Sequence, residues 1–256
     1  EMVELLELNP INTRVNCVRA TGAYCPPKVK ADALRLLCDV VVTSYGAAEV
    51  GRMAWKTASG PEANPRSVGN PVQGVEIAAF DEDGNKLQRG EIGSIRAKVD
   101  PIVAGKYVGS TAVTVAPLSN GWFSTGDTGT ILEDGSLEIL GRSSAVINFG
   151  GNKMHPSFLE EALLSMQGVS AVAVVGVEAP DGFQRICAAM VSSVAVDFES
   201  ANWHLVAKEF EFPVHLVTQL EKLPLLASGK VDRIALQEQF RPKADVPLFV
   251  TLTKHA

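Results

Sequence analysis

The spacing of apolar residues changes at Gly141-Arg142, and this change limits the possible folds more than any other feature. From about residue 66 to 140, short apolar runs are separated by turns such as the Asp-Gly pairs at 83–84 and 134–135. Asp-Gly between apolar runs is a strong hairpin signal. This stretch therefore predicts a small antiparallel sheet or barrel. After residue 142, helical and strand patterns alternate, which predicts a compact α+β domain.

The segment before residue 66 has an interrupted α/β pattern. Residues 31–38 have helical spacing, and residues 39–43 (DVVVT) form a β-branched run typical of a short buried strand. This helix–strand order predicts one edge of a larger parallel sheet. Downstream, we expect helices at 156–166, 201–210 and 231–240 and strands at 171–177 and 213–220, with Pro156 in a first helical turn.

Composition excludes several classes of function. The formal net charge of −6 argues against nonspecific nucleic-acid binding, which needs a surplus of Lys and Arg. No uninterrupted apolar stretch approaches the roughly 20 residues that span a bilayer, and the first residues do not resemble a secretory signal. The four cysteines have no CxxC pairing, which favours reduced thiols over a metal site. We expect a cytoplasmic protein with no nucleic-acid partner and no membrane span.

The first segment with chemical potential, Tyr45-Gly46-Ala47-Ala48-Glu49, directly follows the predicted strand. Open α/β sheets bind ligands at the carboxyl ends of their strands. There a Tyr ring can stack on a purine, and a Glu carboxylate can hold a magnesium ion between phosphates. Taken alone, such a segment is more often an ordinary turn with a solvated Glu.

Asp127 and Arg142 are two further candidates for binding. Asp127 follows a small Thr-Gly pair, so its carboxylate can approach a ligand closely and is well matched to the paired hydroxyls of a ribose. Arg142 is a fixed cation beside a Gly, able to contact ribose or phosphate oxygens. A Gly-Asp turn taken alone is more often structural.

Two loops in the second half add flexible backbone and a mobile charge. Gly150 and Gly151 let the backbone approach a ligand or a neighbouring strand, with a plain loop as the alternative. Lys230 lies on a Ser-Gly turn just before a predicted helix, a placement suited to a point charge that must reach into a site. A single Lys on a loop is more often a surface residue.

The order of these segments is more informative than any one of them. Tyr-Gly-x-x-Glu at 45–49, Thr-Gly-Asp at 125–127, Gly-Arg at 141–142 and Pro-x-x-x-x-Gly-Lys-x-Asp-Arg at 224–233 follow one another. In this order they resemble the adenylate-forming superfamily, which includes acyl-CoA synthetases, adenylation domains of nonribosomal peptide synthetases and beetle luciferases. The resemblance runs from about residue 18 onward. It includes the family's hinge motif, matched at Gly141, Arg142, Gly151, Pro156 and Glu160.

The resemblance implies a role for each candidate residue. Tyr45 would pack on adenine within a nucleotide-binding motif that includes Gly46, and Glu49 would bind magnesium. Asp127 and Arg142 would hold the ribose hydroxyls. Lys230 would stabilise charge on the carboxylate and the α-phosphate as an acyl adenylate forms, as such a transfer requires.

The resemblance also implies a domain organisation of mixed α/β and α+β class. Residues 1–142 would be the end of a large α/β N-terminal AMP-binding domain with a small β-barrel-like subdomain. Residues 143–256 would be a compact, mobile α+β lid domain that pivots at Ser144. In one pose the lid would supply Lys230, and in the other it would present the loop at Gly150 and Gly151 to the pantetheine arm of a thiol such as CoA.

The implied function is part of an ATP-dependent acyl-CoA synthetase, which converts a carboxylate, ATP and CoA into acyl-CoA, AMP and pyrophosphate. The family's phosphate-binding loop is missing, because residues 20–28 lie too near Tyr45 to be that loop and instead resemble the segment lining the acyl pocket. We therefore expect the chain alone to be inactive and to need the missing N-terminal part of the same enzyme. The expected cofactors are ATP/AMP, Mg²⁺ and CoA, with a small-molecule carboxylate as substrate.

Two alternatives stay open. Substitutions within the motifs motivate the first, a degenerate, noncatalytic relative that binds a nucleotide or a partner. The second is an adenylation domain of a peptide synthetase. Ala48 stands where the family usually has Thr, whose hydroxyl contacts the adenylate phosphate. Losing that contact would cost about 1 kcal/mol. The residues that depart from the family pattern are Ala48, Ser144, Ala145, Asn148, Phe158 and Leu226.

Overall fold

The computed structural model describes residues 14–47, 50–98, 118–119 and 121–247. Ala48 and Glu49 lie outside the described residues. The chain divides into two compact units, residues 1–143 and 144–256.

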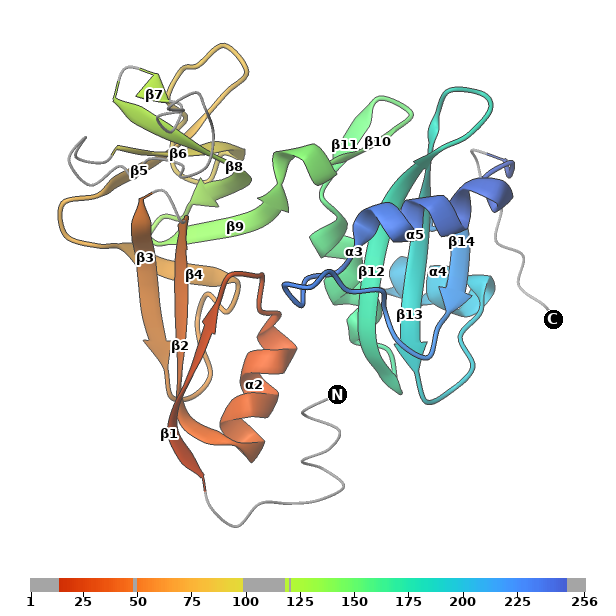
Figure 1. The fold of residues 1–256 in the computed structure, drawn as a ribbon, viewed down its shortest axis with the longest axis horizontal. Coiled ribbons are helices and arrows are strands. Elements are labelled where there is room, and N and C mark those ends of the chain that lie inside the picture. The colour runs from red at the N-terminus through yellow and green to blue at the C-terminus, as the bar shows by residue number, and fades with distance from the viewer. Residues whose placement is uncertain (1–13, 48–49, 99–117, 120, 248–256) are drawn as a thin grey trace. The chain divides into compact units, whose positions relative to one another are not determined.

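The first unit is built on a nine-stranded sheet in the order β1-β2-β3-β4-β9-β8-β6-β5, with β7 paired to β8 (Figure 1). β1 and β2 are parallel, and the other neighbouring strands are antiparallel. The strands are β1 (Val15–Thr21), β2 (Cys38–Ala47), β3 (Gly51–Ala58), β4 (Ser67–Pro71), β5 (Glu76–Phe80), β6 (Gly93–Lys98), β7 (Leu118–Ser119), β8 (Trp122–Ile131) and β9 (Leu137–Arg142).

Helix α2 (Pro27–Leu36) connects the two parallel strands, as a parallel pair requires a crossover. The helix predicted at 31–38 begins and ends earlier in the structure. The helix already begins at Pro27, whose fixed φ suits the first helical position. Cys38, which was assigned to the helix, is instead the first residue of β2.

The two Asp-Gly segments form the predicted turns. Between β8 and β9, the Asp134 carboxylate accepts the backbone N–H of Ser136 at 2.9 Å, and Ile131 pairs with Leu137 across the turn. At 81–85, the Asp81 carboxylate accepts the N–H of Asn85 at 2.7 Å. After this second turn, the chain forms an isolated antiparallel bridge with the last residue of β5. It then continues to β6, which is the partner of β5 in the sheet.

The large sheet curls around one hydrophobic core. Strands far apart in the sheet order contribute to the same buried cluster, which includes Met53 of β3, Ile77 of β5, Ile95 of β6 and Leu137 of β9. Tyr45 of β2 packs against this cluster. The curl therefore brings β2 near strands that are not its neighbours in the sheet.

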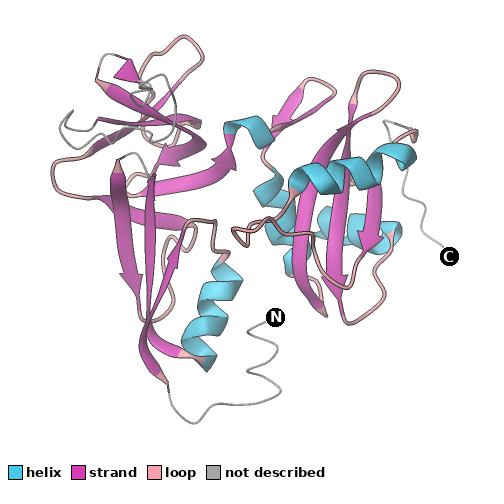
Figure 2. Cartoon of the chain, in the orientation of Figure 1, coloured by secondary structure: helices cyan, strands magenta, loops and turns pink. Residues whose placement is uncertain are grey.

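The second unit has three layers, with the sheet β12-β13-β14 in the middle (Figure 2). Helices α3 and α4 cover one face of the sheet, and α5 covers the other (Figure 1). The elements are β10 (Ile147–Phe149), β11 (Asn152–Met154), α3 (Pro156–Leu164), β12 (Val169–Glu178), β13 (Gln184–Ser192), α4 (Phe198–Ala207), β14 (Leu216–Gln219), α5 (Arg233–Phe240) and the 3-10 helices at Ser143–Ala145 and Arg241–Lys243.

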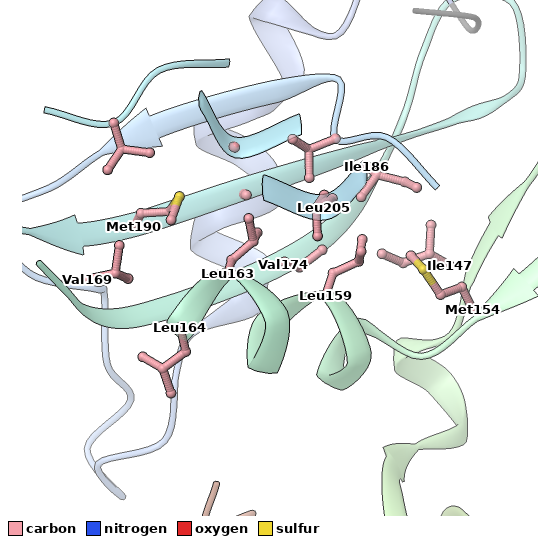
Figure 3. Packing of buried hydrophobic residues seen from close by; sticks show 14 of the residues in the cluster. Ile147, Met154, Leu159, Leu163, Leu164, Val169, Val174, Ile186, Met190 and Leu205 are labelled. Carbon is pink, nitrogen blue, oxygen red and sulfur yellow. The ribbon is translucent and has the colours of Figure 1, made fainter. Parts of the chain in front are cut away.

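Strand periodicity divides the second unit's core into two clusters. On β12, Val174 points to the α3–α4 side, while Ala173 and Val175 point to the α5 side. On β13, Ile186 and Met190 likewise face α3 and α4 (Figure 3). Because helices cover both faces of this sheet, the sequences of these strands are nearly continuous apolar runs without polar alternation.

The helices of the second unit begin where local capping groups allow. Pro156 is the first residue of α3, as predicted. Asp197 caps α4 by accepting the Ser200 N–H at 2.8 Å, so α4 begins at Phe198 and not at residue 201 as the sequence suggested.

Together the two units confirm the expected mixed α/β fold. In the described part of the chain, none of the helices has the length and apolar character needed to cross a membrane.

Candidate functional site

Three of the predicted site residues meet in the first unit. The Tyr45 hydroxyl donates a hydrogen bond to Oδ2 of Asp127, with an oxygen–oxygen distance of 2.6 Å. On the other side of the carboxylate, Nε of Arg142 lies 3.3 Å from Oδ1. A phenol and a guanidinium thus hold the two oxygens of one carboxylate.

The sheet explains how these residues come together. Asp127 on β8 is paired in register with Arg142 on β9. Tyr45 lies on β2, and the sheet order puts β3, β4 and β9 between β2 and β8. Only the curl of the sheet lets the Tyr45 hydroxyl reach Asp127. Tyr45 also lies within β2, which continues to Ala47, and not in a turn after the strand as the sequence suggested.

Thr125 supports this cluster, and the sequence reasoning missed it. Its hydroxyl donates to the carbonyl of Ile95 at 2.8 Å and accepts the backbone N–H of Asp127 at 3.1 Å. Its own carbonyl accepts a hydrogen bond from Nη1 of Arg142 at 2.8 Å. The sequence indicates only a small residue before Gly-Asp, but Thr125 is buried and fixes both partners of the ion pair.

The protonation of Tyr45 is strongly favoured at neutral pH. Burial, followed by the negative charge of Asp127, raises the pKa of the Tyr45 phenol well above its usual value. The phenol therefore remains a donor to the carboxylate. A carboxylate offers about four acceptor positions. The two side-chain contacts leave capacity for further donors, and the head of Arg142 is open to solvent, with its side chain 61% exposed.

Gly46 has a structural role in the described strands. A Cβ built on Gly46 would lie 2.2 Å from the carbonyl oxygen of Gly51, because the backbones of β2 and β3 approach closely at an irregular register. Only glycine fits this close approach without moving the strand.

We expect Gly46→Ala to reduce the free energy of unfolding by about 2 kcal/mol, because the added methyl group meets rigid backbone. Gly60→Ala is the matched control, because a Cβ there meets nothing within 4 Å and its φ is not positive. The control should be neutral or slightly stabilising. Urea unfolding of both variants measures the difference, and equal stabilities would contradict the close-approach explanation.

The predicted magnesium ligand, Glu49, is not among the described residues. Within the described ranges, His, Cys, Asp and Glu side chains form no group of three that could hold a metal ion. Magnesium binding at Glu49 thus stays a prediction.

Lys230 and the glycine pair lie in the second unit, on separate local structures. Lys230 is exposed in a tight turn in which the N–H of Leu226 donates to the carbonyl of Lys230 at 2.8 Å. Gly150 and Gly151 form the two-residue turn between β10 and β11, with φ of 53° and 93°. Positive φ at both positions is typical of a type I′ turn, which explains the two glycines. Ser144 is an exposed residue of a 3-10 helix.

Two matched residues without an assigned role, Glu160 and Arg233, form a well-connected anchor in the second unit. Oε1 of Glu160 lies 2.7 Å from Nη2 of Arg233 and accepts the N–H of Val174 at 2.9 Å. Nη1 of Arg233 donates to the carbonyl of Val174 at 2.6 Å. Asp232 caps the same helix by accepting the Ala235 N–H at 3.0 Å. This anchor fixes the beginning of α5, immediately after the Lys230 turn.

Comparison with known proteins adds independent information. Residues 5–108 match the family model described as AMP-binding enzyme. A salicylyl-CoA synthase / salicylate adenylyltransferase of a Streptomyces species is 28% identical over 93% of this chain and 44% of its own length.

Two solved structures have the same fold. The amide bond synthetase McbA from Marinactinospora thermotolerans is 28% identical, with a TM-score of 0.79, over 89% of this chain and 46% of its own. The ATP-bound MatB from Rhodopseudomonas palustris is 26% identical, with a TM-score of 0.78, over 90% of this chain and 46% of its own. The chain spans less than half the length of these relatives. The ordered motifs, the family model and the shared fold agree, and the chain belongs to the adenylate-forming superfamily.

Proposed function

We propose that the chain is part of an AMP-forming acid–thiol ligase, most closely an acyl-CoA synthetase. The observation that carries this proposal is the Tyr45–Asp127–Arg142 cluster, because it brings the residue implied to pack on adenine together with the two implied to hold the ribose of ATP. The relatives support the reaction class, since one is a salicylyl-CoA synthase / salicylate adenylyltransferase and one solved structure contains ATP.

The chemistry of the cluster fits a nucleoside. The Asp127 carboxylate retains acceptor capacity, and a vicinal diol donates two hydrogen bonds that such a carboxylate can accept. Arg142 adds an exposed cation next to the same site. ATP would supply the adenylyl group, and Glu49 would contribute to magnesium binding.

We assign the two units to the two domains of this family. Residues 1–142 are the C-terminal part of the large AMP-binding domain, and 143–256 are the lid domain that pivots at Ser144. Lys230 supplies positive charge during adenylation, and the turn at Gly150 and Gly151 lies along the CoA channel. The chain's short span relative to its relatives supports the proposal that its activity needs a preceding N-terminal part of the same enzyme, which completes the acid pocket.

Two measurements test the proposed function. Calorimetric titration of this chain with AMP should show binding that Asp127→Asn weakens by about tenfold. Pyrophosphate release by the full-length protein should depend on a carboxylate when a panel of short, long and aromatic acids is supplied. ATP binding without pyrophosphate release on any acid would overturn the ligase proposal and favour a noncatalytic relative, the alternative motivated by the departures from the family pattern at Ala48 and Ser144.

A further inference from the structure

The hydrogen bond from Tyr45 to Asp127 is the longest-range contact of the candidate site. It joins residues 82 positions apart at 2.6 Å, and its acceptor is a carboxylate. Hydrogen bonds of this kind, O–H to an ionised oxygen, are shorter and roughly twice as strong as neutral ones. The contact can therefore fix the orientation of the Asp127 side chain.

Among the described residues, Tyr45 and Arg142 are the side chains that contact the carboxylate, and Tyr45 is the better fixed. Arg142 is 61% exposed, whereas the Tyr45 ring packs against the buried core of the first unit. Thr125 holds Asp127 through the backbone N–H and not through a hydrogen bond between described residues at the carboxylate. The hydrogen bond from the Tyr45 hydroxyl thus fixes the position of Oδ2 of Asp127.

This contact assigns the hydroxyl a task that the ring cannot perform. A ring that packs on a base needs only its aromatic face, which Phe supplies equally well. The hydroxyl group of Tyr45 is instead directed at Asp127, the residue proposed to accept the ribose hydroxyls. Ring and hydroxyl therefore make separable contributions, one to base packing and one to sugar recognition.

We propose that Tyr45 is a positioning residue that sets selectivity for the ribose diol by holding the Asp127 carboxylate through its hydroxyl group. This inference rests on the proposed function, because it requires that Asp127 receives the ribose. Tyr45 contacts the sugar only through Asp127.

Calorimetric titration with two probes, AMP and 2′,3′-dideoxy-AMP, tests the inference on this chain. The wild type should prefer AMP. Tyr45→Phe keeps the ring, so it should weaken AMP binding by about tenfold and leave the affinity for dideoxy-AMP within about twofold. Equal weakening of both probes, or no change in either, would overturn the positioning role.

A double variant protects the result against a simple folding defect. In an Asp127→Asn background, Tyr45→Phe should cause no further change in the ratio of AMP to dideoxy-AMP affinity, because the carboxylate that it orients is gone. A full additional loss in the double variant would show that Tyr45 acts independently of Asp127 and would also refute the inference. If the wild type binds neither probe, the proposed function of the chain fails with it. Wild-type binding with unaltered selectivity in Tyr45→Phe overturns the inference alone.

Discussion

Replacing Lys230 by Ala in the proposed full-length enzyme should reduce acyl-adenylate formation by at least about 100-fold, as removal of one preorganised charge-stabilising group does elsewhere. Lys230 is exposed on a tight turn, and α5 follows that turn directly. In the proposed function, a point charge in this position would contribute to the step in which negative charge develops on the carboxylate and α-phosphate. It would contribute little to transfer of the acyl group from a preformed adenylate to a thiol.

The two half-reactions separate this role from a general defect. Carboxylate-dependent pyrophosphate release measures the first step, and thioester formation from supplied acyl-AMP measures the second, which should stay within about twofold of wild type. Lys222→Ala is the control, because Lys222 is also an exposed Lys on the loop before α5. Equal losses in both half-reactions of Lys230→Ala would refute the assignment.

The second large effect concerns stability. We expect Glu160→Ala to lower the free energy of unfolding of the second unit by about 3 kcal/mol, because it removes an ion pair and a hydrogen bond at once. The Val174 N–H would lose its acceptor, and Arg233 would lose its counter-ion. The ion pair is partly shielded from solvent, since the side chains of Glu160 and Arg233 are 18% and 36% exposed, so water replaces the lost contacts incompletely.

Hydrogen exchange along β12 as a function of urea measures this loss within the second unit. Glu238→Ala is the matched control, because Glu238 is an exposed helical residue of the same unit, and it should change stability by less than about 0.5 kcal/mol. Glu160→Gln keeps an acceptor for Val174 and should fall between the two. A Glu160→Ala variant as stable as the control would mean that the anchor makes no net contribution.

Local features of the fold could be predicted from the sequence because their causes are local. The Asp-Gly turns at 83–84 and 134–135 and the helix start at Pro156 depend on neighbouring residues only, and all three are confirmed. Helix α4 begins three residues before the predicted range of 201–210, because its capping residue, Asp197, precedes the apolar pattern that predicts the helix. Strand β3 (Gly51–Ala58) was not anticipated at all, because its exposed polar positions break up the apolar pattern.

The candidate site was predictable as a set of residues but not as a geometry. The ordered motifs identified Tyr45, Asp127 and Arg142, yet no sequence pattern indicates that a tyrosine on β2 reaches a carboxylate on β8 across three intervening strands. The role of Thr125 was hidden for a similar reason, since its partner Ile95 comes from another strand. Contacts of this kind depend on how the sheet curls, which is a property of the whole core.

The curl of the sheet also has a consequence for the order of folding. Asp127 and Arg142 meet across a short hairpin, which can form early. The Tyr45–Asp127 contact must close a loop of 82 residues, and contacts of such sequence separation are slow to form. We therefore expect the pair on β8 and β9 to assemble first and the phenol to join it only when the sheet is complete. In the proposed function, a newly synthesised chain would then acquire its full nucleotide affinity in the last stage of folding, and the nucleotide would bind molecules in which that stage has finished.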